Sequence, residues 1–437
     1  MSSNSIIWAT APSGTARYVA YAVGIGVTSG VAVTYGGWLG VVGILGMSLL
    51  LRWPVQVALG SFALLLPFDS VSALGSGATG TALTRYVGGF AAVVLLVTGL
   101  WGRRISVPPR AALWWSLFVL WGVATLGWAA NSQSVWERMP TALSLLLFYI
   151  VATGFRIKRN ELSVVLVMTV LGGCIAAVFS AYQFYHGTVY EQTTRSSLMM
   201  GNRDTDPNQF GASLLLPFSL AIGAMLQGRT RIVRLAAGLA TAVLSLAVLL
   251  SMSRGAMVAA VAVVLVYIWR LGWNRRIVLA LTSVSALLLV MPHSFFTRLG
   301  LSDRGAGRLD IWMASMHLLP RYGFFGAGWN NFIVAYTGIA GHAPSFRGYT
   351  RGSHNIYIGM LIEVGIVGLI FLLLAFWSQL RKAATRALIP YEAACWAMLV
   401  MGFTLDIVWR KSFWFAWILL AMAVCLRNED THEGATS

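Results

Sequence analysis

Two residues suited to group-transfer chemistry, an Arg and a His, lie at the edges of apolar segments of this chain. Arg254 separates two apolar runs within Ser251–Ala256, and His354 stands directly before another long run. A guanidinium makes forked hydrogen bonds to phosphate oxygens, and a neutral imidazole accepts a proton. These residues predict a proton transfer beside a bound anion.

The segment around His354 predicts how this residue is held. We expect Ser353 to cap a helix that begins at His354, with His354 in its first turn. The positive helix end and nearby Arg disfavour an imidazolium, so we expect a neutral imidazole that can take a proton. Asn355 and Arg351 are supporting candidates. A purely structural His at a helix start is the alternative.

Other polar segments add candidates for anion binding. Arg195 and Arg203 precede a Pro-Asn step that ends at Asn208, and Arg308 precedes the Gly-rich stretch 326–332. For Arg254, at a hairpin tip between two spans, the alternative to an anion is snorkelling to lipid head groups.

Acidic residues do not predict a metal centre. Asp204-Thr205-Asp206 has the D-x-D pattern of many metal-dependent nucleotide-sugar enzymes, but Pro207 follows directly, so Asp206 is expected to cap a helix. We therefore predict no metal and no cofactor. Asp406 and Arg410 have i,i+4 spacing, and we expect them to pair.

The elements that must position these residues are membrane helices. Of the 437 residues, 58% are hydrophobic and only 10% are charged, which excludes a soluble enzyme and a disordered chain. We predict an all-α polytopic membrane protein with 12–14 spans. The apolar runs are 18–34, 37–51, 54–67, 85–101, 111–129, 140–155, 161–184, 207–226, 233–251, 254–269, 277–291, 354–378, 390–408 and 411–426.

Basic loops predict the orientation of these spans. The loops are 102–110, 155–160, 227–234, 270–276 and 381–386, each two spans from the next. Placing all of them in the cytoplasm puts both termini inside as well. The cations left outside are almost all Arg, which indicates an anionic ligand on that side. They are Arg85, Arg138, Arg195, Arg203, Arg254, Arg298, Arg304, Arg308, Arg321, Arg347, Arg351, Arg410 and Lys411.

One long outer loop divides the chain. Within it, 308–320 has helical amphipathic spacing, with Ile311, Trp312, Met316 and Leu319 on one face. The predicted parts are 1–291 (N-terminal transmembrane helices, with the outer loop 185–206), 292–353 (the long extracytoplasmic loop), 354–426 (C-terminal transmembrane helices) and 427–437 (a cytoplasmic tail).

The ordered motifs resemble the superfamily of O-antigen ligases and O-antigen polymerases, membrane glycosyltransferases. The resemblance covers about residues 190–380. It lies in Arg195 with Gly201 and Pro207-Asn208, in Ser253-Arg254-Gly255, in Arg308 four residues before Trp312, in the Gly326/Gly328 turn with Phe332, and in His354-Asn355.

The resemblance implies a GT-C-like fold in the plasma membrane of a bacterium, with an extracytoplasmic site. The implied reaction moves a glycan from a polyprenyl diphosphate (undecaprenyl or decaprenyl) to a glycolipid or glycan acceptor, with no metal and no nucleic acid. Arg195 and Arg254 would hold the diphosphate, His354 would act on the acceptor hydroxyl, and Arg308 is a plausible third contact. Arg203 competes with Arg195.

Three alternatives stay open at the level of sequence. The motifs do not separate a ligase, which transfers to lipid A-core, from a polysaccharide polymerase, which transfers to another carrier-linked repeat. A transporter of lipid-linked or anionic solutes would also use outward Arg, together with ionisable residues deep in the spans, for which Glu363 and Asp406 are nearly the only candidates. A non-catalytic assembly scaffold would not need His354.

Overall fold

The protein is described from a computed structural model, which defines residues 46, 48–74, 81–192, 195–201, 203–272, 308–339, 352–383 and 385–436. Over these residues it is almost entirely helical. Two short antiparallel hairpins, β1–β2 and β3–β4, are the strand pairs of this part of the chain. The predicted all-α membrane fold is confirmed.

The helices follow the apolar runs closely, and the bounds agree to within a few residues in most cases. One difference is that α5 starts at Ser132, eight residues before its predicted start, because Asn131 caps it and Pro140 lies inside the helix. The elements are α2 (Pro54–Leu65), η1 (Leu66–Phe68), β1 (Ala73–Leu74), β2 (Thr81–Ala82), α3 (Leu83–Trp101), α4 (Ala111–Ala124), η2 (Thr125–Gly127), α5 (Ser132–Thr153), α6 (Arg159–Tyr185), η3 (Tyr190–Gln192), β3 (Met199–Met200), β4 (Arg203–Asp204), α7 (Pro207–Gln227), α8 (Arg231–Leu250), α9 (Arg254–Leu271), α12 (Arg308–Met316), α13 (Leu319–Tyr322), α14 (Phe332–Thr337), α15 (Ile356–Leu380), η5 (Arg386–Leu388), α16 (Ile389–Met401) and α17 (Lys411–Thr436).

Seven of the described helices are long and apolar enough to cross a membrane: α3, α5, α6, α7, α8, α9 and α15. Two shorter apolar helices, Pro54–Phe68 and Ala111–Gly127, accompany them. The predicted runs 18–34 and 277–291 and most of 37–51 lie outside the described residues. The chain is therefore a polytopic membrane protein, and the predicted total of 12–14 spans stays a prediction.

Helix α7 lies at the centre of the bundle. Its apolar stretch is 83% buried, against 28% for α3. It packs against α6, α8, α9 and α16, and α16 also packs along α9. Because Asn208 lies in the first turn of α7 and Arg254 is the first residue of α9, this packing fixes two predicted site residues relative to each other.

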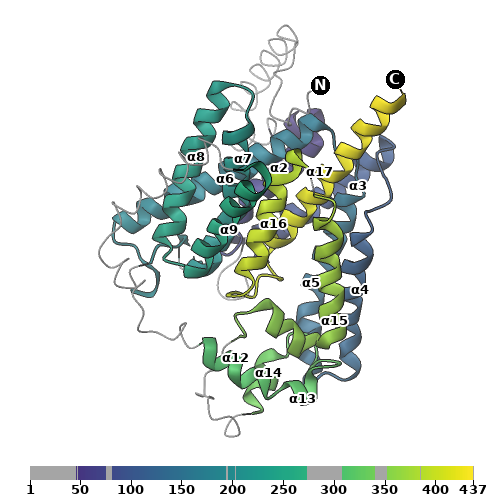
Figure 1. Ribbon diagram of the computed structural model, residues 1–437, viewed down its shortest axis with the longest axis vertical. Coiled ribbons are helices and arrows are strands. Elements are labelled where there is room, and N and C mark those ends of the chain that lie inside the picture. The colour runs from purple at the N-terminus through teal and green to yellow at the C-terminus, as the bar shows by residue number, and fades with distance from the viewer. Residues whose placement is uncertain are drawn as a thin grey trace, which may run out of the picture.

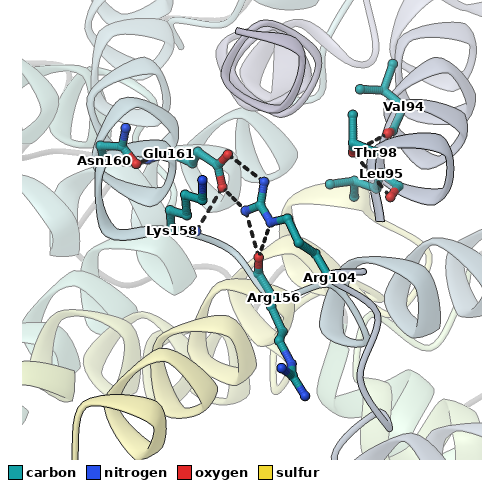
Figure 2. A network of polar contacts seen from close by, with 8 residues as sticks. All are labelled: Val94, Leu95, Thr98, Arg104, Arg156, Lys158, Asn160 and Glu161. Atoms are coloured by element: carbon teal, nitrogen blue, oxygen red, sulfur yellow. Dashed lines mark hydrogen bonds and ion pairs between the residues drawn. The ribbon is translucent and has the colours of Figure 1, made fainter. Parts of the chain in front are cut away.

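The two ends of the bundle differ in structure (Figure 1). At one end lie the short helices α12, α13 and α14, and the C-terminal end of α17 lies at the opposite end. At the end away from α12–α14, the loop after α3 contacts the loop before α6. The guanidinium of Arg104 lies between them and donates to Glu161 Oε1 (2.9 Å) and to the carbonyl oxygen of Arg156 (2.7 Å), as Figure 2 shows. The predicted basic loops 102–110 and 155–160 therefore lie at one end of the bundle.

The predicted amphipathic helix over 308–320 is divided in two. Helix α12 ends at Met316, and Pro320 belongs to the first turn of α13, where its missing N–H is tolerated. Ile311 and Leu318 are buried against α14 and α15, whereas Met316 is exposed. Because Leu319 belongs to α13, the expected single helical face of Ile311, Trp312, Met316 and Leu319 is interrupted after Met316, and its position at the membrane surface stays a prediction.

Candidate active site

His354 lies just outside α15 rather than inside it. The cap of α15 is Asn355, whose side-chain oxygen accepts from the backbone N–H groups of Tyr357 (2.9 Å) and Ile358 (3.1 Å). The expectation that Ser353 caps the helix and that His354 occupies its first turn is wrong, because Asn355 provides the cap. His354 has φ +46°, in the left-handed region that non-glycine residues seldom adopt. The effect of the positive helix end on a His in the first turn therefore no longer supports a neutral imidazole at His354. The neutral imidazole stays a prediction.

The carboxylate of Asp406 holds the segment that contains His354. One of its oxygens accepts from the Ser353 hydroxyl (2.8 Å) and the other from the backbone N–H of His354 (3.2 Å). Gly359 faces the same contact, where a Cβ atom would lie 2.6 Å from Ser353 Oγ. These bonds fix the unusual backbone of His354 and make Asp406 a positioning residue.

The expected pair between Asp406 and Arg410 is wrong. Residues 402–410 form turns rather than a helix, so i,i+4 spacing does not bring the two side chains together. No ion pair joins them among the residues that the structure describes. Sequence reasoning missed the role of Asp406, although an acid in an apolar outer segment was a usable signal.

Arg254 occupies the predicted hairpin tip. It is the first residue of α9, and Ser253 caps the helix by accepting from the N–H of Ala256 (3.3 Å). The guanidinium is exposed and makes no hydrogen bond or ion pair to another described residue. The next residue, Gly255, packs so closely on the 402–410 turn that a Cβ atom would lie 2.1 Å from Thr404 Oγ1. Arg254 is therefore held near the turn that carries Asp406.

Arg195 stabilises the turn in front of Arg254. Its Nε donates to the carbonyl oxygen of Ser251 (3.1 Å), and its Nη2 donates to Asn208 Oδ1 (2.9 Å). The same oxygen accepts from the Ser253 hydroxyl (2.9 Å). Arg195 and Asn208 thus join the start of α7 to the α8–α9 turn, and direct contact of Arg195 with a diphosphate stays a prediction.

Arg203 and the two aspartates lie in the neighbouring hairpin. Arg203 and Asp204 form β4, which pairs with β3. Asp206 caps α7 by accepting from the N–H groups of Asn208 (2.8 Å) and Gln209 (3.3 Å), so the predicted cap is confirmed. Since Arg195 rather than Arg203 contacts Asn208 in the described bonds, the structure favours Arg195 as the residue linked to the Arg254 turn.

Arg308 joins the same group from the long loop. Trp312, on the same helix, donates its indole N–H to the carbonyl oxygen of Ser353 (3.0 Å), so α12 contacts the His354 segment. Burial lowers the pKa of Arg308, Arg254 lowers it further, and Asp206 and Asp406 oppose this change. Arg308 makes no hydrogen bond or ion pair within the described part of the chain. Arg351 lies outside the described residues.

Three candidates thus gather at one end of the bundle: an exposed Arg254, a half-buried Arg308 and the His354 segment held by Asp406. Residues 239–373 match the family described as O-antigen ligase (Wzy_C). The chain carries an O-antigen ligase domain. This domain indicates membrane glycan transfer of the O-antigen ligase or polymerase type, with lipid-linked glycan substrates. A search of curated proteins gave no match to the chain.

The matched range covers only part of the site. It includes Arg254, Arg308 and His354, whereas Arg195 precedes it and Asp406 follows it. These last two residues contact the α8–α9 turn and the His354 segment, so both reach residues of the matched range from outside it.

Within the ligase domain, α15 is broken at Gly365, which has φ +69°. The loop after α13 fills the break: Ala327 N–H donates to the carbonyl oxygen of Ile362 (2.7 Å), and Gly328 N–H to that of Glu363 (2.9 Å). Gly326 has no room for a side chain, because a Cβ atom would lie 2.2 Å from the Glu363 carbonyl oxygen. The glycine turn therefore has a structural role at the break of α15, and its grouping with Arg308 stays a prediction.

No group of three or more His, Cys, Asp and Glu side chains arranged to hold a metal ion occurs among the described residues. The polar groups at the site are instead guanidinium groups, a His and capping carboxylates. Guanidinium groups can bind an oxyanion, and a neutral His can accept a proton.

Proposed function

We propose that the protein transfers a glycan from a polyprenyl diphosphate to an acceptor hydroxyl on the extracytoplasmic face of a bacterial plasma membrane, without a metal, as an O-antigen ligase does. The observation that carries this proposal is the combination of Arg254 and Arg308 near the Asp406-bound segment of His354. Guanidinium groups that lack protein acceptors suit a diphosphate.

The arrangement supports a simple displacement. The acceptor oxygen attacks the anomeric carbon of the donor glycan, and the bond from that carbon to the diphosphate oxygen breaks. The leaving diphosphate takes the electron pair, so negative charge grows on the bridging oxygen, where Arg254 and Arg308 stabilise it. The proton of the acceptor hydroxyl goes to a neutral His354, which acts as the general base.

The test is transfer by the purified full-length protein with a polyprenyl-diphosphate-linked glycan and an acceptor glycolipid. His354→Ala should abolish transfer while donor binding stays near normal, because the diphosphate is held by Arg. His354→Gln should not restore it, since an amide cannot take the proton. The matched control is His317→Ala, an exposed His in the same loop. Substantial transfer by His354→Ala at saturating substrates would remove His354 as the base.

The orientation belongs to the same proposal. We place α12–α14 and the site outside and both termini in the cytoplasm. Single-Cys labelling from outside, in a background without the native Cys, should modify positions in 308–339 and spare 102–110 and 381–386. The reverse pattern would overturn the orientation and the extracytoplasmic site with it.

A polymerase is the alternative with the same chemistry, because its acceptor is a second carrier-linked repeat. The glycan products of a deletion strain separate the two: unattached polymer on the carrier indicates a ligase, and single repeats without a ladder indicate a polymerase. A transporter is the more distant alternative. The break of α15 around the buried Glu363 is the one observation that favours it, since broken helices form substrate sites in transporters.

A further inference from the structure

The turn that carries Asp406 ends in a second cation, Arg410. Its backbone N–H closes the turn by donating to the carbonyl oxygen of Ile407 (2.9 Å). Its guanidinium is half-buried and makes no hydrogen bond or ion pair with any described residue. A partly desolvated guanidinium without an acceptor is unfavourable, so an anion that enters here gains a strong partner.

The neighbouring cation, Lys411, differs from Arg410 in having acceptors among the described residues. Lys411 Nζ donates to Asp69 Oδ1 (2.5 Å) and to Thr84 Oγ1 (2.8 Å). Asp69, the acid with the strongest effect on the pKa of Arg410, is therefore already bound by the lysine. Arg410 keeps a charge that no direct contact with a described residue neutralises.

Arg138, from α5, adds a second positive charge beside Arg410. It donates to Asn330 Oδ1 (2.8 Å), and its guanidinium lies 4.8 Å from the ring centre of Trp409. Trp409 in turn packs against Trp329, with ring centres 4.9 Å apart. The indole ring thus orients Arg138 next to the turn that ends in Arg410.

Arg308 and Arg410, one arginine from each pair, have two acidic neighbours in common. Burial lowers the pKa of Arg410, with Asp69 opposing this change most strongly, and Asp206, Asp406 and Arg138 also act on it. Arg308 responds to Asp206 and Asp406 as well, but its cationic neighbour is Arg254. Asp406 therefore acts on the pKa of both Arg308 and Arg410, and it is also the residue that binds the His354 segment.

We propose that Arg410, supported by Arg138, binds a phosphate of the acceptor, while Arg254 and Arg308 bind the diphosphate of the donor. This inference rests on the proposed function. A transferase with a base at His354 must hold its donor and its acceptor at the same time. Both possible acceptors, the lipid A-core glycolipid of a ligase and the carrier-linked repeat of a polymerase, carry phosphate as well as sugar hydroxyls. The chemistry named here is a phosphate-bearing lipid acceptor, and it gives a role to a cation outside the pair that the proposed function assigns to the donor.

The kinetic test uses the full-length protein in lipid nanodiscs, with an undecaprenyl-diphosphate-linked glycan as donor. The acceptors are a phosphorylated lipid A–core glycolipid, the same glycolipid after phosphatase treatment, and a carrier-linked repeat. Arg410→Ala should raise the KM for a phosphorylated acceptor by about tenfold to a hundredfold, as expected for loss of one charge-assisted contact, with the donor KM unchanged. Arg410→Gln keeps most of the side-chain volume and should behave alike. The acceptor whose KM rises identifies the phosphate source.

The control is Arg321→Ala, an exposed arginine on α13 at the same end of the bundle. With dephosphorylated glycolipid, wild type and Arg410→Ala should have equal KM values. An equal rise of KM with and without acceptor phosphate, an effect on donor KM alone, or behaviour like Arg321→Ala would overturn the inference.

A binding measurement separates this inference from the proposed function. Undecaprenyl diphosphate alone is titrated into wild type, Arg254→Ala and Arg410→Ala and followed by tryptophan fluorescence. Weaker binding in Arg254→Ala with normal binding in Arg410→Ala is expected. Normal binding in Arg254→Ala contradicts the donor site of the proposed function. Where the kinetic test identifies the glycolipid as the acceptor, weakened binding in Arg410→Ala contradicts the acceptor assignment alone. A carrier-linked acceptor bears the same diphosphate as the probe, so in that case a raised donor KM in Arg410→Ala is the result that contradicts the acceptor assignment.

Discussion

Arginines at the two ends of the helix bundle have different partners. At the end away from α12–α14, Arg104 is paired with Glu161, and Arg270 makes two bonds to Glu392, at 3.0 and 2.6 Å. Both carboxylates are largely buried, so each guanidinium neutralises a charge that the fold has removed from water. These arginines stabilise the packing between helices.

At the His354 end, the carboxylates are used differently. Asp206 caps α7 and Asp406 binds the His354 segment, so neither forms an ion pair with Arg254 or Arg308. The chain has 31 Lys and Arg, and their number alone does not separate structural from ligand-binding residues. We propose the presence or absence of a protein acceptor as the criterion for the arginines at the two ends, so substitutions should affect stability at one end and transfer at the other.

The largest expected effect is at Arg254. Arg254→Ala should lower kcat/KM for transfer by about 10²–10³-fold, because the growing charge on the diphosphate loses a fixed donor. Arg254→Lys keeps the charge but not the forked geometry, so it should also be severely impaired. Initial rates at saturating acceptor measure both variants. Thermal unfolding of each should stay near wild type, since Arg254 has no described partner to lose.

Near-normal transfer by Arg254→Lys would contradict a specific donor-binding role for Arg254 and weaken the contrast between the two ends. It would mean that Arg254 supplies only a diffuse positive field or contacts lipid head groups, and Arg308 would then be the residue to test for a specific donor contact.

The next effect is at Asp406, a positioning residue. Asp406→Ala removes both acceptors of the His354 segment and should lower kcat by about 10²-fold, the loss expected when a reacting group moves by about 1 Å. Asp406→Asn should retain much more activity, because an amide can still accept from His354 N–H while donating to Ser353 Oγ. Both are compared by kcat and by its pH dependence, with undecaprenyl diphosphate binding as the control. An Asn variant as inactive as the Ala variant would mean that the charge of Asp406, rather than its hydrogen bonds, is what matters.

A smaller effect, on stability rather than on chemistry, is expected at the opposite end. Glu161→Gln leaves Arg104 without its carboxylate and should reduce the free energy of unfolding by about 1–3 kcal/mol, less than a fully buried pair because Arg104 is partly solvated. Thermal unfolding in detergent measures the loss, with the exposed Glu137→Gln as control. Transfer per folded molecule should not change. A large loss of transfer in the folded Glu161→Gln protein would contradict the division between the two ends.

The sequence predicted the helices and caps that depend on residues close together in the chain. The runs that became α6 and α9 were found because apolar length specifies a span, and the cap at Asp206 was found because an Asp before Pro is a local signal. The hairpin tip at Arg254 follows from the same reasoning, since the break between two apolar runs is visible in the sequence.

What the sequence did not reveal depends on contacts between distant residues. Asp406 binds a segment 52 and 53 positions away, and the glycine loop at Gly326 fills a break in α15. No periodicity encodes either contact. The start of α15 was misplaced by two residues for a related reason: Ser353 and Asn355 are both good caps, and Asp406 decides between them by taking the Ser353 hydroxyl.

The smallest expected effect is that of removing divalent cations. Asp204-Thr205-Asp206 is the only sequence pattern that suggested a metal, and Asp206 uses one carboxylate oxygen for two backbone N–H groups of α7. Coordination by that oxygen would compete with the cap and with the positive end of the helix, which opposes a cation. Transfer by purified protein should therefore be unchanged in excess chelator, and Asp204→Asn should behave as wild type. Loss of transfer in chelator that a divalent cation restores would return Asp204 and Asp206 to the site as ligands. The unpaired arginines would then share charge stabilisation with a metal, and the contrast between the two ends of the bundle would no longer identify the catalytic groups by itself.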